Sequence, residues 1–327
     1  MPANANKKVL ITGANGFIGQ FLGHYLLEND YHLVHALRSP KSIQQALAAG
    51  QLQYIGNIDA HTDWSQALKA VDIVVHLAAR VHVMAETAAN PLLAFEQTNY
   101  HGTINLAKQA ISAGVKRFIY LSSIKVNGEQ TKEQPFCADD PAVTLDDPYA
   151  LSKQQAELAL LDLQQQGLLE VVIIRPPLVY GAGVKGNFLR LIQLAEKQLP
   201  LPLKQIKNQR SLVSVNNLCS LIQCGMEHPK ASGQVFLVSD GRDISSSELL
   251  AQISQALQCK NRLFYLPRGL LQVLTSAIGK SQEFQRLFDS LQVDIDKNRQ
   301  LLNWQPQTSM QSALQQTINF YQKEQAE

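Results

Sequence analysis

Short apolar runs and helix-length amphipathic segments alternate through the first half of the chain. The apolar runs are rich in Val, Ile and Leu and lack a polar alternation, which is typical of strands buried on both faces of a parallel sheet. Helical segments between such strands predict right-handed crossover connections. The predicted strands are 8–12, 33–37, 52–55, 72–77, 117–121 and 169–174, and the predicted helices are 17–28, 42–49, 92–113 and 149–166.

The regular alternation of predicted strands and helices ends at Gly181. A flexible loop at 181–186 precedes a predicted helix at 187–197, the run 234–238 returns to the sheet, and the chain is mainly helical from 245. We therefore expect an α/β fold, a doubly wound parallel sheet with a smaller, discontinuous C-terminal lobe. In this prediction the sheet domain comprises residues 1–180 and about 213–243. The smaller lobe comprises about residues 181–212 and 244–327.

Composition narrows the classes of protein that fit this pattern. Of the 327 residues, 45% are hydrophobic and 17% are charged, with a net charge of +2. That balance suits a folded core, and the scattered basic residues form no nucleic-acid-binding stripe. No signal-peptide pattern or membrane-length apolar run is visible, and the four cysteines lack metal-site spacing. We expect a cytoplasmic protein with reduced cysteines, no metal, no nucleic acid and no membrane span.

A glycine motif, Gly13, Gly16 and Gly19, follows the first predicted strand and opens the first helix. Glycines there permit a tight turn, let backbone amides approach a pyrophosphate and let helix and strand pack closely. The motif predicts a Rossmann-type dinucleotide-binding domain. At the end of the second strand, Leu37 stands where a carboxylate usually binds the adenosine ribose, and Arg38 follows it. Because arginine can pair with a 2′-phosphate, this strand end favours NADP over NAD.

Tyr149 and Lys153 lie four residues apart, on one face of a predicted helix. A free tyrosine has a pKa of about 10, and a neighbouring ammonium lowers it. The pair therefore predicts a tyrosine that exchanges a proton with a carbinol oxygen near neutral pH. Ser123 comes at the carboxyl end of a predicted strand, where ligands gather in doubly wound sheets.

Together these motifs resemble those of extended short-chain dehydrogenases/reductases of the NAD-dependent epimerase/dehydratase family. T-G-x-x-G-x-x-G at 12–19, H-L-A-A at 76–79, Ser123, Y-x-x-x-K at 149–153 and R-P-P-L-V-Y-G at 175–181 occur in family order and spacing. The similarity extends over nearly the whole chain, to L-L-N-W-Q-P at 301–306. It implies an enzyme that transfers hydride between NAD(P) and C4 of a UDP-linked hexose or hexosamine, like UDP-glucose 4-epimerases.

The resemblance also implies roles for individual residues. Ser123, Tyr149 and Lys153 would be catalytic, and Ser123 would also contact substrate. The implied cofactor-binding residues are Gly13, Gly16, Phe17, Ile18, Gly19, Arg38, Asn57, Ile58, Leu77, Ala78, Ala79, Asn99, Tyr149, Lys153 and Pro176. The implied substrate-binding residues are Ser123, Lys125, Asn187, Arg210 and Arg286. The helices 92–113 and 149–166 would form the four-helix bundle of a homodimer.

Departures from the family pattern separate the possible reactions. Sugar-nucleotide 4,6-dehydratases carry an Asp-Glu pair where this chain has Ile124 and Lys125. The chain therefore lacks the acid and the base with which those enzymes eliminate water. Well-known UDP-hexose 4-epimerases have tyrosine and asparagine where this chain has Asn127 and Leu178. Segments 123–129 and 286–294 resemble a subgroup from bacterial surface-polysaccharide clusters.

That subgroup leaves two reactions open. One is 4-epimerisation, and the other is NADPH-dependent reduction of a UDP-4-keto-6-deoxy-hexosamine. A reductase of small ketones and a dinucleotide-sensing binding protein are more remote alternatives. Arg210 argues against the first of these, and the retained Tyr149 and Lys153 argue against the second.

Overall fold

The computed structural model describes residues 7–42, 47–81, 90–141, 143–204, 206–267 and 288–326. Its main sheet has seven parallel strands in the order β3-β2-β1-β4-β5-β6-β9. The order reverses between β1 and β4, which makes the sheet doubly wound, as predicted. The strands are β1 (Lys8–Thr12), β2 (His32–Leu37), β3 (Gln51–Tyr54), β4 (Ile73–His76), β5 (Arg117–Leu121), β6 (Glu170–Arg175) and β9 (Gln234–Leu237).

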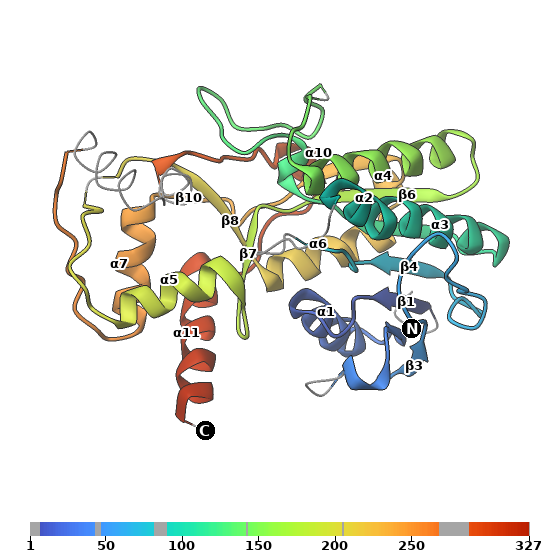
Figure 1. Ribbon diagram of the computed structural model, residues 1–327, viewed down its shortest axis with the longest axis horizontal. Coiled ribbons are helices and arrows are strands. Elements are labelled where there is room, and N and C mark those ends of the chain that lie inside the picture. Colours follow the sequence, from blue (N-terminus) through green and yellow to red (C-terminus); the bar gives the residue numbers. More distant parts are fainter. Residues whose placement is uncertain are drawn as a thin grey trace.

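Helices cover both faces of this sheet (Figure 1). Helices α1 (Phe17–Glu28) and α6 (Val215–Glu227) pack together on one face, and their apolar residues join the core formed by β1, β4, β5 and β6. The opposite face carries α2 (Pro91–Glu96), α3 (Gly102–Ser112) and α4 (Pro148–Gln165). Burial on both faces explains why the central strands are nearly continuous apolar runs.

A second, three-stranded sheet with the order β10-β8-β7 lies beside the first. Around it pack three helices that share a separate apolar core (Figure 1). These elements are β7 (Leu178–Tyr180), β8 (Arg210–Ser214), β10 (Asp243–Ile244), α5 (Gly186–Glu196), α7 (Ser246–Ala256) and α11 (Met310–Ala326). The helix α10 (Asp296–Leu302) instead packs against β9. The division into two domains at the predicted boundaries stays a proposal.

Two local predictions differ from the structure. For the predicted helix 42–49, the described residues contain the end of the 3-10 turn Pro40–Ser42, and residues 47–49 are not helical. Residues 43–46 lie outside the described residues. The long predicted helix 92–113 is continuous but contains a π turn at Gln97–His101, between α2 and α3. Elsewhere in the described ranges, 3-10 turns occur at Ile124–Val126 and Pro229–Ala231.

In the part of the chain that the structure describes, no helix combines the length and the apolar composition that a bilayer crossing requires. Within the same residues, no group of three or more His, Cys, Asp or Glu side chains is arranged to hold a metal ion.

Candidate active site

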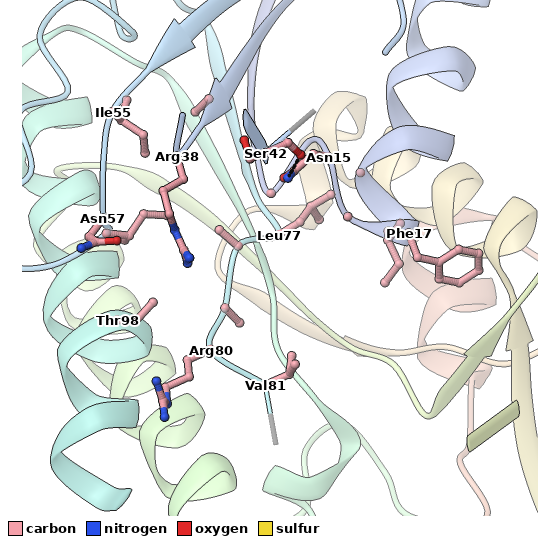
Figure 2. A pocket seen from close by; sticks show the side chains of 18 of the residues that line it. Asn15, Phe17, Arg38, Ser42, Ile55, Asn57, Leu77, Arg80, Val81 and Thr98 are labelled. Carbon is pink, nitrogen blue, oxygen red and sulfur yellow. Dashed lines mark hydrogen bonds between the residues drawn. The ribbon is translucent and has the colours of Figure 1, made fainter. Parts of the chain in front are cut away.

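A cavity of about 990 Å³ lies at the carboxyl ends of β1, β2 and β4, where the strand order reverses. This is the place where doubly wound sheets bind their ligands. Figure 2 shows side chains from several elements arranged around it. Most of the predicted cofactor residues line the cavity: Gly13, Gly16, Phe17, Ile18, Gly19, Arg38, Asn57, Ile58, Leu77, Ala78 and Ala79.

The glycine turn at the start of α1 is packed so closely that side chains are excluded. Gly13 has a φ of +68°, and a Cβ there would come within 2.9 Å of the Ala78 backbone nitrogen. A Cβ on Gly19 would come within 2.2 Å of the Gly13 carbonyl oxygen. The turn therefore brings the positive end of α1 against the cavity, as an anion such as a pyrophosphate requires.

Two arginines line the part of the cavity beyond the glycine turn. Figure 2 shows the Arg38 side chain extending from the end of β2 and Arg80 following the end of β4. Leu37, directly before Arg38, is buried in the core with 1% exposure. The end of β2 thus presents a cation to the cavity and buries an apolar residue where a ribose-binding carboxylate would otherwise stand.

A buried hydrogen-bond relay supports the cavity wall from behind. The Thr103 hydroxyl donates to the Asn99 carbonyl (2.7 Å), so it accepts from Nε2–H of His76 (2.9 Å). His76 Nδ1 then accepts from the Thr12 hydroxyl (2.7 Å), whose oxygen accepts from the Ala78 amide (3.1 Å). The relay fixes a neutral His76, and burial lowers its pKa to about 3.

Asn99 connects the cavity wall to helix α4. It lies in the π turn, and its side chain accepts from the Arg80 amide (2.8 Å) while donating to the Arg80 carbonyl and to the Ser152 hydroxyl, both at 3.0 Å. Single π turns inside α-helices are often found at functional sites. Asn99 does not line the cavity itself, and its contacts set the position of residues that do.

Ser123 and Tyr149 face each other at the carboxyl end of β5. Ser123 begins the 3-10 turn Ile124–Val126, where its hydroxyl accepts from the Lys125 amide (3.3 Å), and it lies close enough to the Tyr149 phenol to influence its pKa. The Tyr149 ring packs edge-on against Phe95, at 6.0 Å between centroids, and Phe95 in turn lies under the Arg80 guanidinium. Burial raises the pKa of Tyr149 to about 12. The nearby Ser123 hydroxyl opposes this shift, and the Asp147 carboxylate adds a smaller upward contribution.

Lys153 lies one turn farther along α4 and is 2% exposed. Its ammonium donates to the Leu121 carbonyl (2.8 Å) and lies 4.5 Å from the centroid of the Tyr120 ring. Burial lowers its pKa to about 7, and the Glu157 carboxylate opposes that shift. The predicted direction of the Tyr149 pKa is therefore wrong for this structure: its net shift is upward, because burial outweighs the influence of neighbouring charges.

Among the other predicted substrate residues that the structure describes, Lys125, Asn187 and Arg210 do not line the cavity. Lys125 pairs with Asp147 and Glu129, and Asn187 is exposed at the start of α5. Arg210 begins β8, and its guanidinium donates to the Asp289 carbonyl (3.0 Å). Arg286 lies outside the described residues.

The remaining predicted cofactor residue, Pro176, is buried beside the Ser123 loop. Its carbonyl accepts a hydrogen bond from the Ile124 amide (3.0 Å), and it is not among the residues that line the cavity.

Several residues that line the cavity were missed by sequence reasoning. The sequence could have identified Arg80, because it directly follows the H-L-A-A motif. Lys185 comes from a distant loop, and no sequence motif marks it. The missed residues are Asn15, Ala36, Ser42, Ile55, Gly56, Asp59, Arg80, Val81, Ala94, Gln97, Thr98, Val179, Val184, Lys185 and Gly186.

Comparisons with known proteins agree with this geometry. The model of the NAD dependent epimerase/dehydratase family matches residues 9–239. The chain is 45% identical over 318 residues to a UDP-glucose 4-epimerase of Vibrio cholerae, covering 96% of this chain and 95% of that protein. It is 26% identical over 274 residues to the N-acetyl-alpha-D-glucosaminyl-diphospho-ditrans,octacis-undecaprenol 4-epimerase of Escherichia coli O157:H7, covering 81% and 77%.

Solved structures share the fold over almost the whole chain. A UDP-glucuronic acid 4-epimerase from Bacillus cereus, crystallised with NAD, superposes with a TM-score of 0.77 at 21% identity, covering 97% of this chain and 99% of that one. A UDP-glucose 4-epimerase from Thermotoga maritima, crystallised with UDP-glucose, gives a TM-score of 0.76 at 19% identity with the same coverage.

Proposed function

Because this chain belongs to the NAD-dependent epimerase/dehydratase family, we propose that it interconverts the C4 epimers of a UDP-linked hexose or hexosamine. The observation that carries the proposal is the meeting of Ser123, Tyr149 and Lys153 at the carboxyl end of β5, beside a dinucleotide-sized cavity. The 45% identity to a UDP-glucose 4-epimerase supports the same reaction.

The cavity fits NAD(P) by its own chemistry. The glycine turn offers backbone amides and the positive end of α1 for the pyrophosphate. Arg38 at the end of β2 would meet the adenosine ribose, and Asn57 and Ile58 would border the adenine. Lys153 would hold the nicotinamide ribose. A bound nicotinamide would supply the hydride acceptor for C4 and return the hydride to the opposite face of the sugar.

The residues of the chain would handle the proton of the sugar hydroxyl. Tyr149 accepts the O4 proton during oxidation of C4 and gives it back when the 4-keto sugar is reduced. Ser123 donates a hydrogen bond to the same oxygen. The high pKa of Tyr149 favours its protonated form, which is the form that donates to the keto sugar. Acceptance of the proton requires a cation to stabilise the phenolate, and Lys153 is the ammonium one helical turn away.

The decisive experiment is to incubate the purified enzyme with UDP-glucose, and separately with UDP-N-acetylglucosamine, and to follow the C4 epimers by NMR. We expect interconversion without net consumption of added dinucleotide, because the hydride is returned to the same carbon. Stoichiometric oxidation of NADPH by a UDP-4-keto-6-deoxy-hexosamine, without epimerisation, would instead support the reductase alternative. Absence of both reactions would contradict the proposal.

We propose that the chain prefers NADP(H) over NAD(H), because Arg38 faces the cavity and the preceding Leu37 is buried. Arg38→Ala should weaken NADPH binding by about 1–3 kcal/mol, the range of a lost charge-assisted contact, and NADH binding much less. Calorimetric titration with both dinucleotides checks this. Lys41→Ala, which removes an exposed cation from the adjacent 3-10 turn, is the matched control. Equal losses for NADPH and NADH would contradict the preference.

Arg210 is the proposed contact for the UDP diphosphate. It starts β8 in the smaller sheet, where the Asp289 carbonyl holds its guanidinium. Because the diphosphate does not react, Arg210→Ala should raise KM more than it lowers kcat. UDP binding should weaken about tenfold, or ~1.4 kcal/mol.

Calorimetry with UDP measures the effect of Arg210→Ala. The control is Arg242→Ala, because Arg242 is an exposed cation in the same region. If UDP binds the Arg210 variant and the wild type equally, Arg210 is a structural residue.

The remaining parts of the proposal concern the biological setting. A role in surface-polysaccharide synthesis agrees with the name of the Escherichia coli relative, which acts on an undecaprenol-linked sugar. A homodimer formed through α2, α3 and α4 and a cytoplasmic location also belong to the proposal.

A further inference from the structure

A buried ion pair lies directly behind the proposed catalytic residues. Arg175, the last residue of β6, donates from Nε to both carboxylate oxygens of Glu157 (3.0 and 3.1 Å) and from Nη2 to Oε2 (2.5 Å). The Glu157 side chain is 2% exposed and that of Arg175 is 13% exposed. Glu157 lies four residues after Lys153 on α4, one helical turn away. Burying two charges carries a large desolvation free energy, which only close, well-directed contacts offset.

The third guanidinium nitrogen of Arg175, Nη1, contacts the turn that Ser123 begins. Nη1 donates to Asn127 Oδ1 (2.9 Å), and the Asn127 amide donates to the Cys137 carbonyl (3.0 Å). Asn127 ends the 3-10 turn that Ser123 begins. Arg175 therefore connects the strand β6, the helix α4 and the Ser123 turn through four hydrogen bonds, three to Glu157 and one to Asn127.

We propose that Glu157 and Arg175 are positioning residues, which hold α4 and the Ser123 turn together so that Ser123, Tyr149 and Lys153 keep their mutual geometry and charge. The inference rests on the proposed function, because it concerns the proton transfer assigned to Tyr149. A planar guanidinium suits this task, since its donors are fixed in one plane and bind a carboxylate at two points.

The charge of Glu157 acts on Lys153 as well as on Arg175. Tyr149 lies one helical turn before Lys153 on α4. Among the described residues, the titratable groups that act on Lys153 or contact it are His76 on β4, Tyr120 on β5 and Glu157 on α4, with Arg175 of β6 behind Glu157. Of these, the Glu157 carboxylate is the group that opposes the burial-induced fall in the pKa of Lys153. With Glu157 neutral, Lys153 loses its proton at lower pH, and the buried Arg175 cation adds repulsion.

Glu157→Gln tests the inference in the full-length enzyme, because it keeps the size of the side chain and removes its charge. We expect kcat to fall about tenfold or more and the alkaline limb of the kcat–pH profile to move to lower pH. Calorimetric binding of UDP should be unchanged, since the substitution lies away from the proposed Arg210 contact.

A matched control sits at the other end of the same strand. Glu170, the first residue of β6, forms an ion pair with the buried Arg117 (2.8 Å from Nε). Glu170→Gln removes a carboxylate–guanidinium pair without touching the catalytic end. It should lower thermal stability but leave the kcat–pH profile in place.

The outcomes separate the inference from the proposed function. If the wild type epimerises UDP-sugars and Glu157→Gln shows the wild-type profile, or loses activity only in proportion to its stability, the positioning role is wrong. If the wild type shows no turnover, the proposed function itself fails. Should Glu157→Gln not fold, the double variant Glu157→Leu/Arg175→Met removes both charges, a replacement that folded proteins often tolerate. Wild-type kcat in that variant would equally overturn the inference.

Discussion

Burial governs the pKa values of Tyr149 and Lys153 more than neighbouring charges do. Tyr149 lies between Phe95, Ser123 and the Asp147 carboxylate, and its pKa rises to about 12. Lys153 is buried against Tyr120, and its pKa falls to about 7. Sequence spacing placed both side chains on one helical face. Spacing contains no information on the degree of burial, so it gave the wrong direction for the pKa of Tyr149.

Removing the phenolic hydroxyl tests the proton-transfer role. Tyr149→Phe should leave the fold and cofactor binding intact, because the ring still packs against Phe95. Turnover of the UDP-sugar should fall by about 10²–10⁴, the usual contribution of a positioned acid/base. Steady-state kinetics and thermal unfolding measure the two effects. The exposed Tyr54 provides the control variant Tyr54→Phe, and near-wild-type turnover of Tyr149→Phe would remove Tyr149 from the mechanism.

Elements with a strong local signal were predicted closely, and those that depend on tertiary contacts were not. The strand β1 and helix α1 have the predicted bounds, because glycines and continuous apolar residues mark them. The π turn Gln97–His101 was not predicted, since its sequence has ordinary helical character. Its position is instead associated with the contacts of Asn99 to Arg80 and Ser152. The relay through His76 likewise requires four elements to be in place.

The relay of His76 makes stability depend on pH. The ordinary pKa of histidine is about 6.5, and in the folded protein burial lowers that of His76 to about 3. The unfolded chain therefore binds a proton that the folded chain rejects. The stabilising contribution is complete above about pH 6.5 and is lost as the pH falls toward about 3, with a slope of at most about 1.4 kcal/mol per pH unit.

Urea unfolding at about pH 7 and about pH 5 measures this contribution in the wild type and in His76→Gln. Glutamine keeps a donor and an acceptor but does not titrate in this range. The wild type should lose more stability on acidification than the variant, even though the buried His35, whose pKa is also lowered, titrates in both. Parallel losses would show that His76 does not control the acid sensitivity.

At the scale of the whole molecule, two helices that cover one face of the main sheet carry exposed apolar side chains. Leu93 on α2 is 59% exposed and Leu158 on α4 is 58% exposed, and α2 packs beside α4 (Figure 1). Large exposed apolar residues on adjacent helices are typical of surfaces that another protein covers. They agree with the proposed homodimer, in which these helices of two protomers form a four-helix bundle.

Replacing Leu158 by glutamate tests that dimer. In a two-fold interface each substitution occurs twice, and a leucine side chain contributes about 1.5–3 kcal/mol on burial. Leu158→Glu should therefore weaken dimerisation by at least about a hundredfold and give a monomer in sedimentation analysis at micromolar concentration. Leu168→Glu, at an exposed leucine in the loop after α4, should remain dimeric. A wild type that sediments as a monomer, or a dimer that Leu158→Glu does not weaken, would show that these helices do not form the interface.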